Sequence, residues 1–83
     1  MANVHRLMAL GMAHDMAKRV DAQIVAGTGA FKPLIELGMP SGLAKVLAAQ
    51  ITAGTANVKK LCELGMAGPV AREVAAQIVA AAE

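Results

Sequence analysis

Aromatic side chains are almost absent from this 83-residue chain, which has no Trp, no Tyr and a single Phe, Phe31. The hydrophobic 57% of the sequence is therefore almost entirely Ala, Leu, Val, Ile and Met. Small side chains allow helices to pack closely, but each buries little area. A chain this short has room for one small core, so we expect apolar surface to stay exposed and to mark contacts with other proteins.

Cysteine and charge are also scarce. The single cysteine, Cys62, excludes an intrachain disulfide and any site built from several cysteines. Eight Lys and Arg against six Asp and Glu give a net charge of +2. That balance argues against nucleic acid and anionic membranes as partners. No run approaches the roughly 20 apolar residues that span a bilayer, and we expect no signal peptide.

What the sequence does contain is a repeat. Residues 3–29 align without gaps on residues 30–56, and both align on residues 57–83. The shared pattern is L-x-x-L-G-M-x-x-x-x-A-x-x-x-x-A-Q-I-x-A, which an Ala-rich composition does not produce by chance. Self-similarity of this kind decides the architecture. We predict a single all-α domain over residues 1–83, made of three tandem helix-turn-helix repeats.

Each copy is predicted to begin with a short helix, starting near residues 4, 31 and 58. Asn3 and Asn57 stand at the N-cap position of two of them. Gly11, Gly38 and Gly65 are expected to end these helices, because a positive φ costs glycine nothing. Apolar residues at i, i+3 and i+4 spacing predict one buried stripe per helix, with Cys62 as a buried structural thiol. The stripe residues are Val4, Leu7, Met8, Leu10, Phe31, Leu34, Ile35, Leu37, Val58, Leu61, Cys62 and Leu64.

A longer helix is predicted to begin about three residues after each of these glycines. His14, Ser41 and Gly68 are the expected N-caps, and Pro69 falls on the first helical position that proline prefers. The predicted buried stripe consists of Met16, Ala17, Val20, Ile24, Leu43, Ala44, Leu47, Ile51, Val70, Ala71, Val74 and Ile78. Helices of about seven residues are unstable alone. The six helices should therefore pack as a compact bundle or a short α-solenoid, of which we favour the bundle.

Two sets of side chains that recur in all copies are possible interface residues. Gln23, Gln50 and Gln77 are either boundary residues that cap loop backbone groups, or amides that bond the Leu-Gly-Met turn of an adjoining copy or subunit. The methionines follow that turn, where a flexible thioether either fills a gap in the core or forms an exposed ridge for a partner. These methionines are Met12, Met39 and Met66.

No group of residues in the sequence indicates catalysis. His5 and His14 have no companion ligands at metal spacing, Ser41 is the only serine, and no carboxylate recurs in all three copies. We therefore predict a protein that is not an enzyme, with no cofactor, no metal and no small-molecule substrate.

Two binding classes remain as alternatives. A glycine between two helices is typical of helix-turn-helix DNA-binding proteins, but the second helix of the middle copy, around residues 42–49, has almost no side chain that reads base edges. The Leu-Gly-Met turn also resembles the Met-Gly-Phe loop of ubiquitin-associated domains over a few residues per copy. That resemblance implies a soluble helical adaptor.

The segment LIELGMPSGLAKVLAAQI, residues 34–51, resembles short helical segments of tailed-bacteriophage virion proteins, notably head-fibre, capsid decoration and fibre-anchoring proteins. The resemblance covers all three copies. It implies a structural subunit that contacts capsid or fibre proteins and associates with itself. Its location would be the virion, and the host cytoplasm before assembly.

Overall fold

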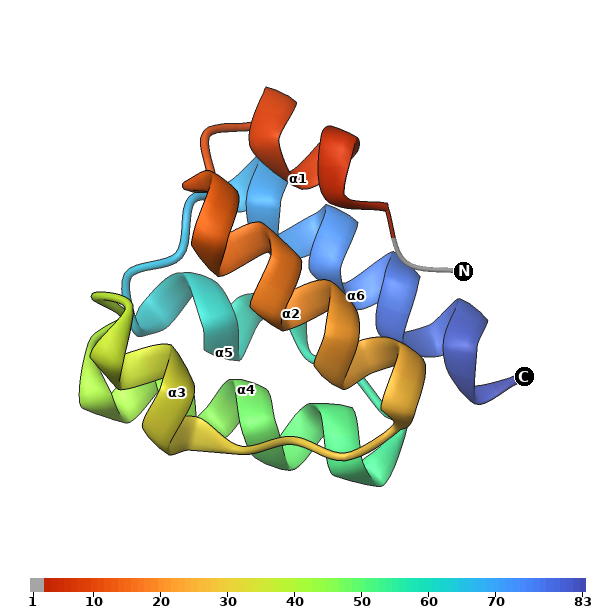
Figure 1. Cartoon of the computed structure of the whole chain (residues 1–83). Helices are drawn as coiled ribbons and strands as arrows, with labels where there is room; N and C mark the ends of the chain where they lie inside the picture. The colour runs from red at the N-terminus through yellow and green to blue at the C-terminus, as the bar shows by residue number, and fades with distance from the viewer. Residues whose placement is uncertain (1–2) are drawn as a thin grey trace.

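Short and long helices alternate along the chain in the computed structural model, which describes residues 3–83 (Figure 1). The short helices are α1 (Val4–Ala9), α3 (Phe31–Glu36) and α5 (Val58–Glu63), with six residues each. The long helices are α2 (His14–Ala26) and α4 (Ser41–Ala53), with 13 residues each, and α6 (Gly68–Ala82), with 15. The all-α prediction is confirmed, and the six helices of the described residues form a compact globule.

The short helices begin where side-chain caps are available. Asn3 Oδ1 accepts a hydrogen bond from the backbone N–H of Arg6 at 3.1 Å, and Asn57 Oδ1 accepts one from Lys60 at 3.0 Å. Each short helix ends at a leucine followed by a glycine with φ between 112° and 114°. In the first turn the N–H of Met12 then donates to the Leu7 carbonyl at 3.0 Å, and the other two turns make the same bond.

The long helices begin one residue earlier than the sequence predicted. Their N-caps are Ala13, Pro40 and Ala67, with ψ between 142° and 147°, and none makes a side-chain capping bond. The prediction that His14, Ser41 and Gly68 are the caps was therefore wrong, and Pro69 follows the first helical residue. The cause is the preceding turn, whose hydrogen bonds leave only one extended residue after the methionine before the helix starts.

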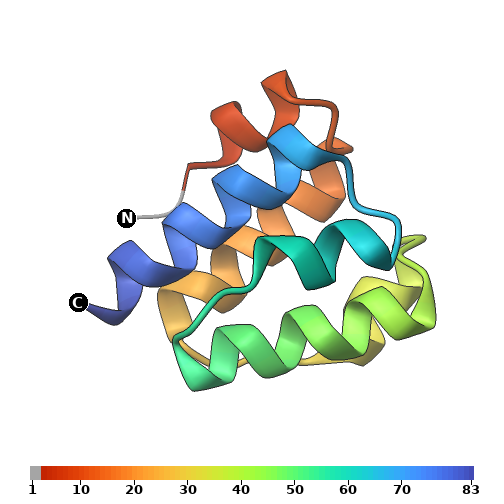
Figure 2. The same ribbon diagram turned by 180° about the vertical axis from the view of Figure 1, so that it is seen from behind.

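The three long helices run in broadly the same direction, so their first turns gather at one end of the molecule and their last turns at the other (Figures 1 and 2). Each short helix packs on the long helix that follows it and on the preceding long helix: α3 on α4 and α2, and α5 on α6 and α4. Helix α1 packs on α2 and also on α6. The helix pairs therefore close into a ring.

The core lies between the long helices. All twelve residues of their predicted stripe are buried, and the alanines among them, Ala17, Ala44 and Ala71, have no exposed surface. One leucine from each short helix completes the core: Leu7, Leu34 and Leu61 are also fully buried. The i, i+3, i+4 pattern is thus confirmed for the long helices.

The predicted stripe of the short helices is only partly confirmed beyond those three leucines. Met8, Leu10, Phe31, Ile35, Leu37 and Cys62 are exposed, while Val4, Val58 and Leu64 are half-buried. A six-residue helix makes fewer than two turns, so only one leucine of each short helix is fully buried, while Val4, Val58 and Leu64 pack against the core from its rim. Cys62 consequently has an exposed thiol and not the buried one expected.

The backbone geometry predicts opposite effects for glycine-to-alanine substitution at Gly38 and at Gly42. Gly38→Ala should destabilise the protein by about 1 kcal/mol or more, because φ is 113° there although a new Cβ would meet no atom within 4 Å. Gly42→Ala lies inside α4, where the Cβ would be 3.8 Å from Leu64 Cδ2, an ordinary contact. It should stabilise by about 0.5–1 kcal/mol. Denaturant unfolding of both variants measures this, and equal effects would contradict the assigned turn.

Candidate interaction surface

The turns between short and long helices meet at one end of the molecule and enclose an apolar depression of about 410 Å³. No charged side chain lines it. We call it the methionine depression, after the three methionines that follow the Leu-Gly turns. Its lining consists of Leu10, Gly11, Met12, Met16, Met39, Pro40, Leu43, Met66, Ala67 and Val70.

The three turn methionines form the floor of this depression and not a ridge above it. Met39 and Met66 are buried, with 7% and 8% of their surface exposed, and Met12 is half-buried. Two of the Leu-Gly turns also leave apolar side chains exposed, since Leu10 is 39% and Leu37 40% accessible. The sequence left open whether the methionines pack in the core or face a partner. Met39 and Met66 belong to the core and Met12 packs against it, which favours core packing over an exposed ridge.

Backbone electrostatics give this end a positive character. The first turns of α2, α4 and α6 meet here, and their N-cap residues supply no side-chain acceptor for the first-turn N–H groups. Asp15 is the only acidic residue in any of these three first turns. Because helix dipoles place partial positive charge at N-termini, the methionine depression lies beside three weakly positive helix ends.

The glutamines lie far from the Leu-Gly-Met turns, in the second half of each long helix. Gln23 Nε2 donates to the Ala30 carbonyl at 2.9 Å, and the Ala30 N–H donates to Gln23 Oε1 at 3.1 Å. The Asn57 N–H donates to Gln50 Oε1 at 3.3 Å. Each amide thus holds the residue immediately before the next short helix. Bonding to the Leu-Gly-Met turn, one of the two predicted roles, is not what these amides do.

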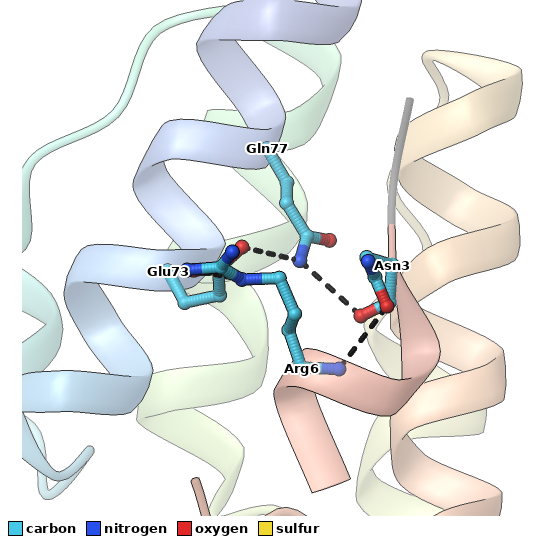
Figure 3. Close-up of polar contacts among 4 residues, drawn as sticks. All are labelled: Asn3, Arg6, Glu73 and Gln77. Carbon is cyan, nitrogen blue, oxygen red and sulfur yellow. Dashed lines mark hydrogen bonds and ion pairs between the residues drawn. The ribbon is translucent and has the colours of Figure 1, made fainter. Parts of the chain in front are cut away.

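Gln77 makes the corresponding contact between α6 and the residue before α1, where the ring of helices closes (Figure 3). Its Nε2 donates to the Asn3 carbonyl at 3.3 Å and to Glu73 Oε2 at 2.9 Å. Gln23 and Gln77 are buried, with 7% and 4% exposed surface, so neither is a solvated residue. Sequence reasoning did not identify Glu73, although the alignment of Asn3 with Ala30 and Asn57 indicates where the amide of Gln77 would bind.

Among residues 3–83, no group of three His, Cys, Asp or Glu side chains lies close enough together to hold a metal ion. None of the helices in this part of the chain has the length and apolar character needed to cross a bilayer. No protein-family model, curated protein sequence or solved structure matches the chain. The surface itself therefore carries the functional argument.

The glutamine hydrogen bonds predict that replacing glutamine by alanine lowers the free energy of unfolding more at position 23 than at position 50. Gln23→Ala should lower the free energy of unfolding by about 1–3 kcal/mol, because both backbone groups of Ala30 lose their partner. Gln50→Ala should cost less than about 1 kcal/mol, since it removes one longer bond from a half-buried side chain. Chemical denaturation of the two variants provides the comparison. A larger loss at position 50 would contradict this ranking.

Proposed function

We propose that the chain is a non-enzymatic structural subunit of a tailed-phage virion, of the capsid decoration, head-fibre or fibre-anchoring kind. In this proposal it consists of three tandem 27-residue repeats and docks through the methionine depression. The observation that carries the proposal is the convergence of all three Leu-Gly-Met turns on one uncharged apolar surface. Each turn belongs to the repeated unit, residues 34–51 in the middle copy, that resembles short helical segments of virion proteins.

The placement of equivalent residues supports the repeat. The three Leu-Gly-Met glycines share one backbone conformation, with φ of 112°, 113° and 114°. The three leucines that precede them by four positions are each fully buried, and each glutamine contacts the residue seven positions on or its counterpart across the ring. In this proposal the repeat brings one methionine from each copy, Met12, Met39 and Met66, to the same depression.

The depression suits an apolar side chain from a virion protein. Methionine side chains adapt their shape and make polarizable contacts. The depression that they line therefore accepts a leucine, a methionine or an aromatic residue. Leu10, which lines the depression, is 39% exposed and leaves its apolar side chain accessible to a partner. A contact of this size binds weakly on its own, but a virion presents many identical sites and offsets modest affinity by avidity.

A soluble helical adaptor is the second candidate, favoured by the same exposed apolar turn. It would use the methionine depression for a cellular protein and would occur as free protein and not in particles. The occurrence of the chain in virions separates the two. Gradient-purified particles of the source phage, analysed by mass spectrometry, should contain the chain at a constant copy number per capsid. Absence from the particles would overturn the virion proposal.

If the methionine depression is the docking surface, an aspartate introduced there should weaken binding to particles, whereas an aspartate introduced elsewhere should not. Met12→Asp places a carboxylate at the half-buried edge of the depression, and rebinding to particles that lack the chain should weaken at least tenfold. Val25→Asp is the matched control at the opposite end of α2, where the side chain is 64% exposed, and should rebind like the original chain. Both variants should retain the helical circular dichroism spectrum. Equal rebinding would remove the depression from the interface.

A further inference from the structure

A second apolar depression, of about 390 Å³, lies at the other end of the molecule, where α2, α4 and α6 end (Figures 1 and 2). Its floor consists of equivalent isoleucines from the three long helices, each almost completely buried. We call it the isoleucine depression, after Ile24, Ile51 and Ile78. A Cβ added at Gly54 would lie 3.1 Å from Ala82 Cβ, so the ends of α4 and α6 meet closely here.

The backbone donors at this end are already used, whereas backbone acceptors remain. Gly27 and Gly54 are the C-caps of α2 and α4, and their N–H groups donate back to carbonyls of their own helices. Thr52 is the only lining residue with a polar side chain, and its hydroxyl accepts from the Gly29 N–H at 2.9 Å. The last four carbonyls of a helix have no partner within that helix. Three sets of such carbonyls therefore surround the isoleucine floor.

The glutamine contacts explain why two of these carbonyls have no partner in the following loop. Ala26 and Ala53 are the last residues of α2 and α4, and both line the depression. In a longer helix, their carbonyls would accept from the N–H groups four positions further on. Those N–H groups donate to the side chains of Gln23 and Gln50 instead. The carbonyls of Ala26 and Ala53 are thus left for an external donor.

No basic side chain compensates the negative potential at this end. Helix dipoles place partial negative charge at C-termini, where lysine and arginine are favourable. The last turns of α2, α4 and α6 contain no basic residue, and no charged side chain among residues 3–83 lines the depression. Glu83, the C-cap residue of α6, adds a carboxylate next to Ala82. The isoleucine depression therefore has the opposite backbone polarity to the methionine depression.

We propose that the isoleucine depression binds a lysine side chain of a partner protein. The four-carbon stem of lysine suits the isoleucine floor, and its ammonium has three rotatable donors for carbonyls from several helix ends. Arginine fits this arrangement less well, because its planar fork matches a carboxylate. An acidic side chain is repelled by the same carbonyls, and an uncharged aliphatic one leaves them without a donor. The inference does not rest on the virion proposal.

Titration of the isotope-labelled chain, followed by NMR, tests the site with small probes. Nα-acetyllysine amide should shift the backbone N–H resonances of Gly27, Gly54 and Ala82, and leave those of Met39 and Met66 unchanged. Nα-acetylnorleucine amide has the same four-carbon side chain without the ammonium, and should bind about fivefold or more weakly. Equal affinity for the two probes, or no shift at this end, would overturn the proposal.

A third probe, n-hexylammonium, separates a protein lysine from a free alkylammonium compound. A lysine site should bind both n-hexylammonium and Nα-acetyllysine amide at the same resonances. If n-hexylammonium alone binds, the depression takes free alkylammonium compounds and the assignment to a partner's lysine is wrong.

Two lysine substitutions in the last turns of α6 provide matched variants. Ala81 lines the depression and is exposed, so in Ala81→Lys the chain's own ammonium should occupy the site and weaken Nα-acetyllysine amide binding at least about tenfold. Ala80 is also exposed but does not line it, and Ala80→Lys should change the affinity less than about threefold. Both variants should retain the helical circular dichroism spectrum. An equal loss in both would show that net charge and not the depression controls binding, which contradicts the proposal.

Discussion

The fold depends on one core that is shared by three long helices running in the same direction (Figures 1 and 2). Each contributes one alanine with no exposed surface, Ala17, Ala44 and Ala71, surrounded by buried valine, leucine and isoleucine. Parallel helices cannot follow one another directly along a chain, so each must be preceded by a segment that returns to its starting end. The six-residue helices provide that return, and their single buried leucines seal the core at its rim.

Parallel packing also explains why the candidate surface lies where it does. Turns that are separated by 27 residues in sequence come together only because the first turns of α2, α4 and α6 share one end. Aligned dipoles repel one another mildly, and burial of the long-helix stripe outweighs that cost. The result is an end of the molecule where an apolar depression, lined in part by Met39 and Met66, lies beside the first turns of three helices.

The local sequence pattern predicted the positions of the helices better than the contacts that each helix makes. A 13-residue helix must bury one face, so its periodicity identified the core residues, and glycines identified the ends of the short helices. The same periodicity failed for the short helices, where Cys62 and Ile35 face outward. The partner of Gln77 and the role of Glu73 depend on which helices meet across the ring. The periodicity of a segment does not show which other segments it contacts.

The contact between α6 and α1 has a consequence for how many helix pairs this architecture holds. An open α-solenoid leaves an apolar face at each end and needs specialised terminal units to cover it. Here the last pair covers the first, and no terminal unit is needed. The number of helix pairs is then set by the curvature of the ring. A fourth pair inserted into the chain would have to break the contact between α6 and α1, or widen the ring until the alanine-lined centre no longer packs.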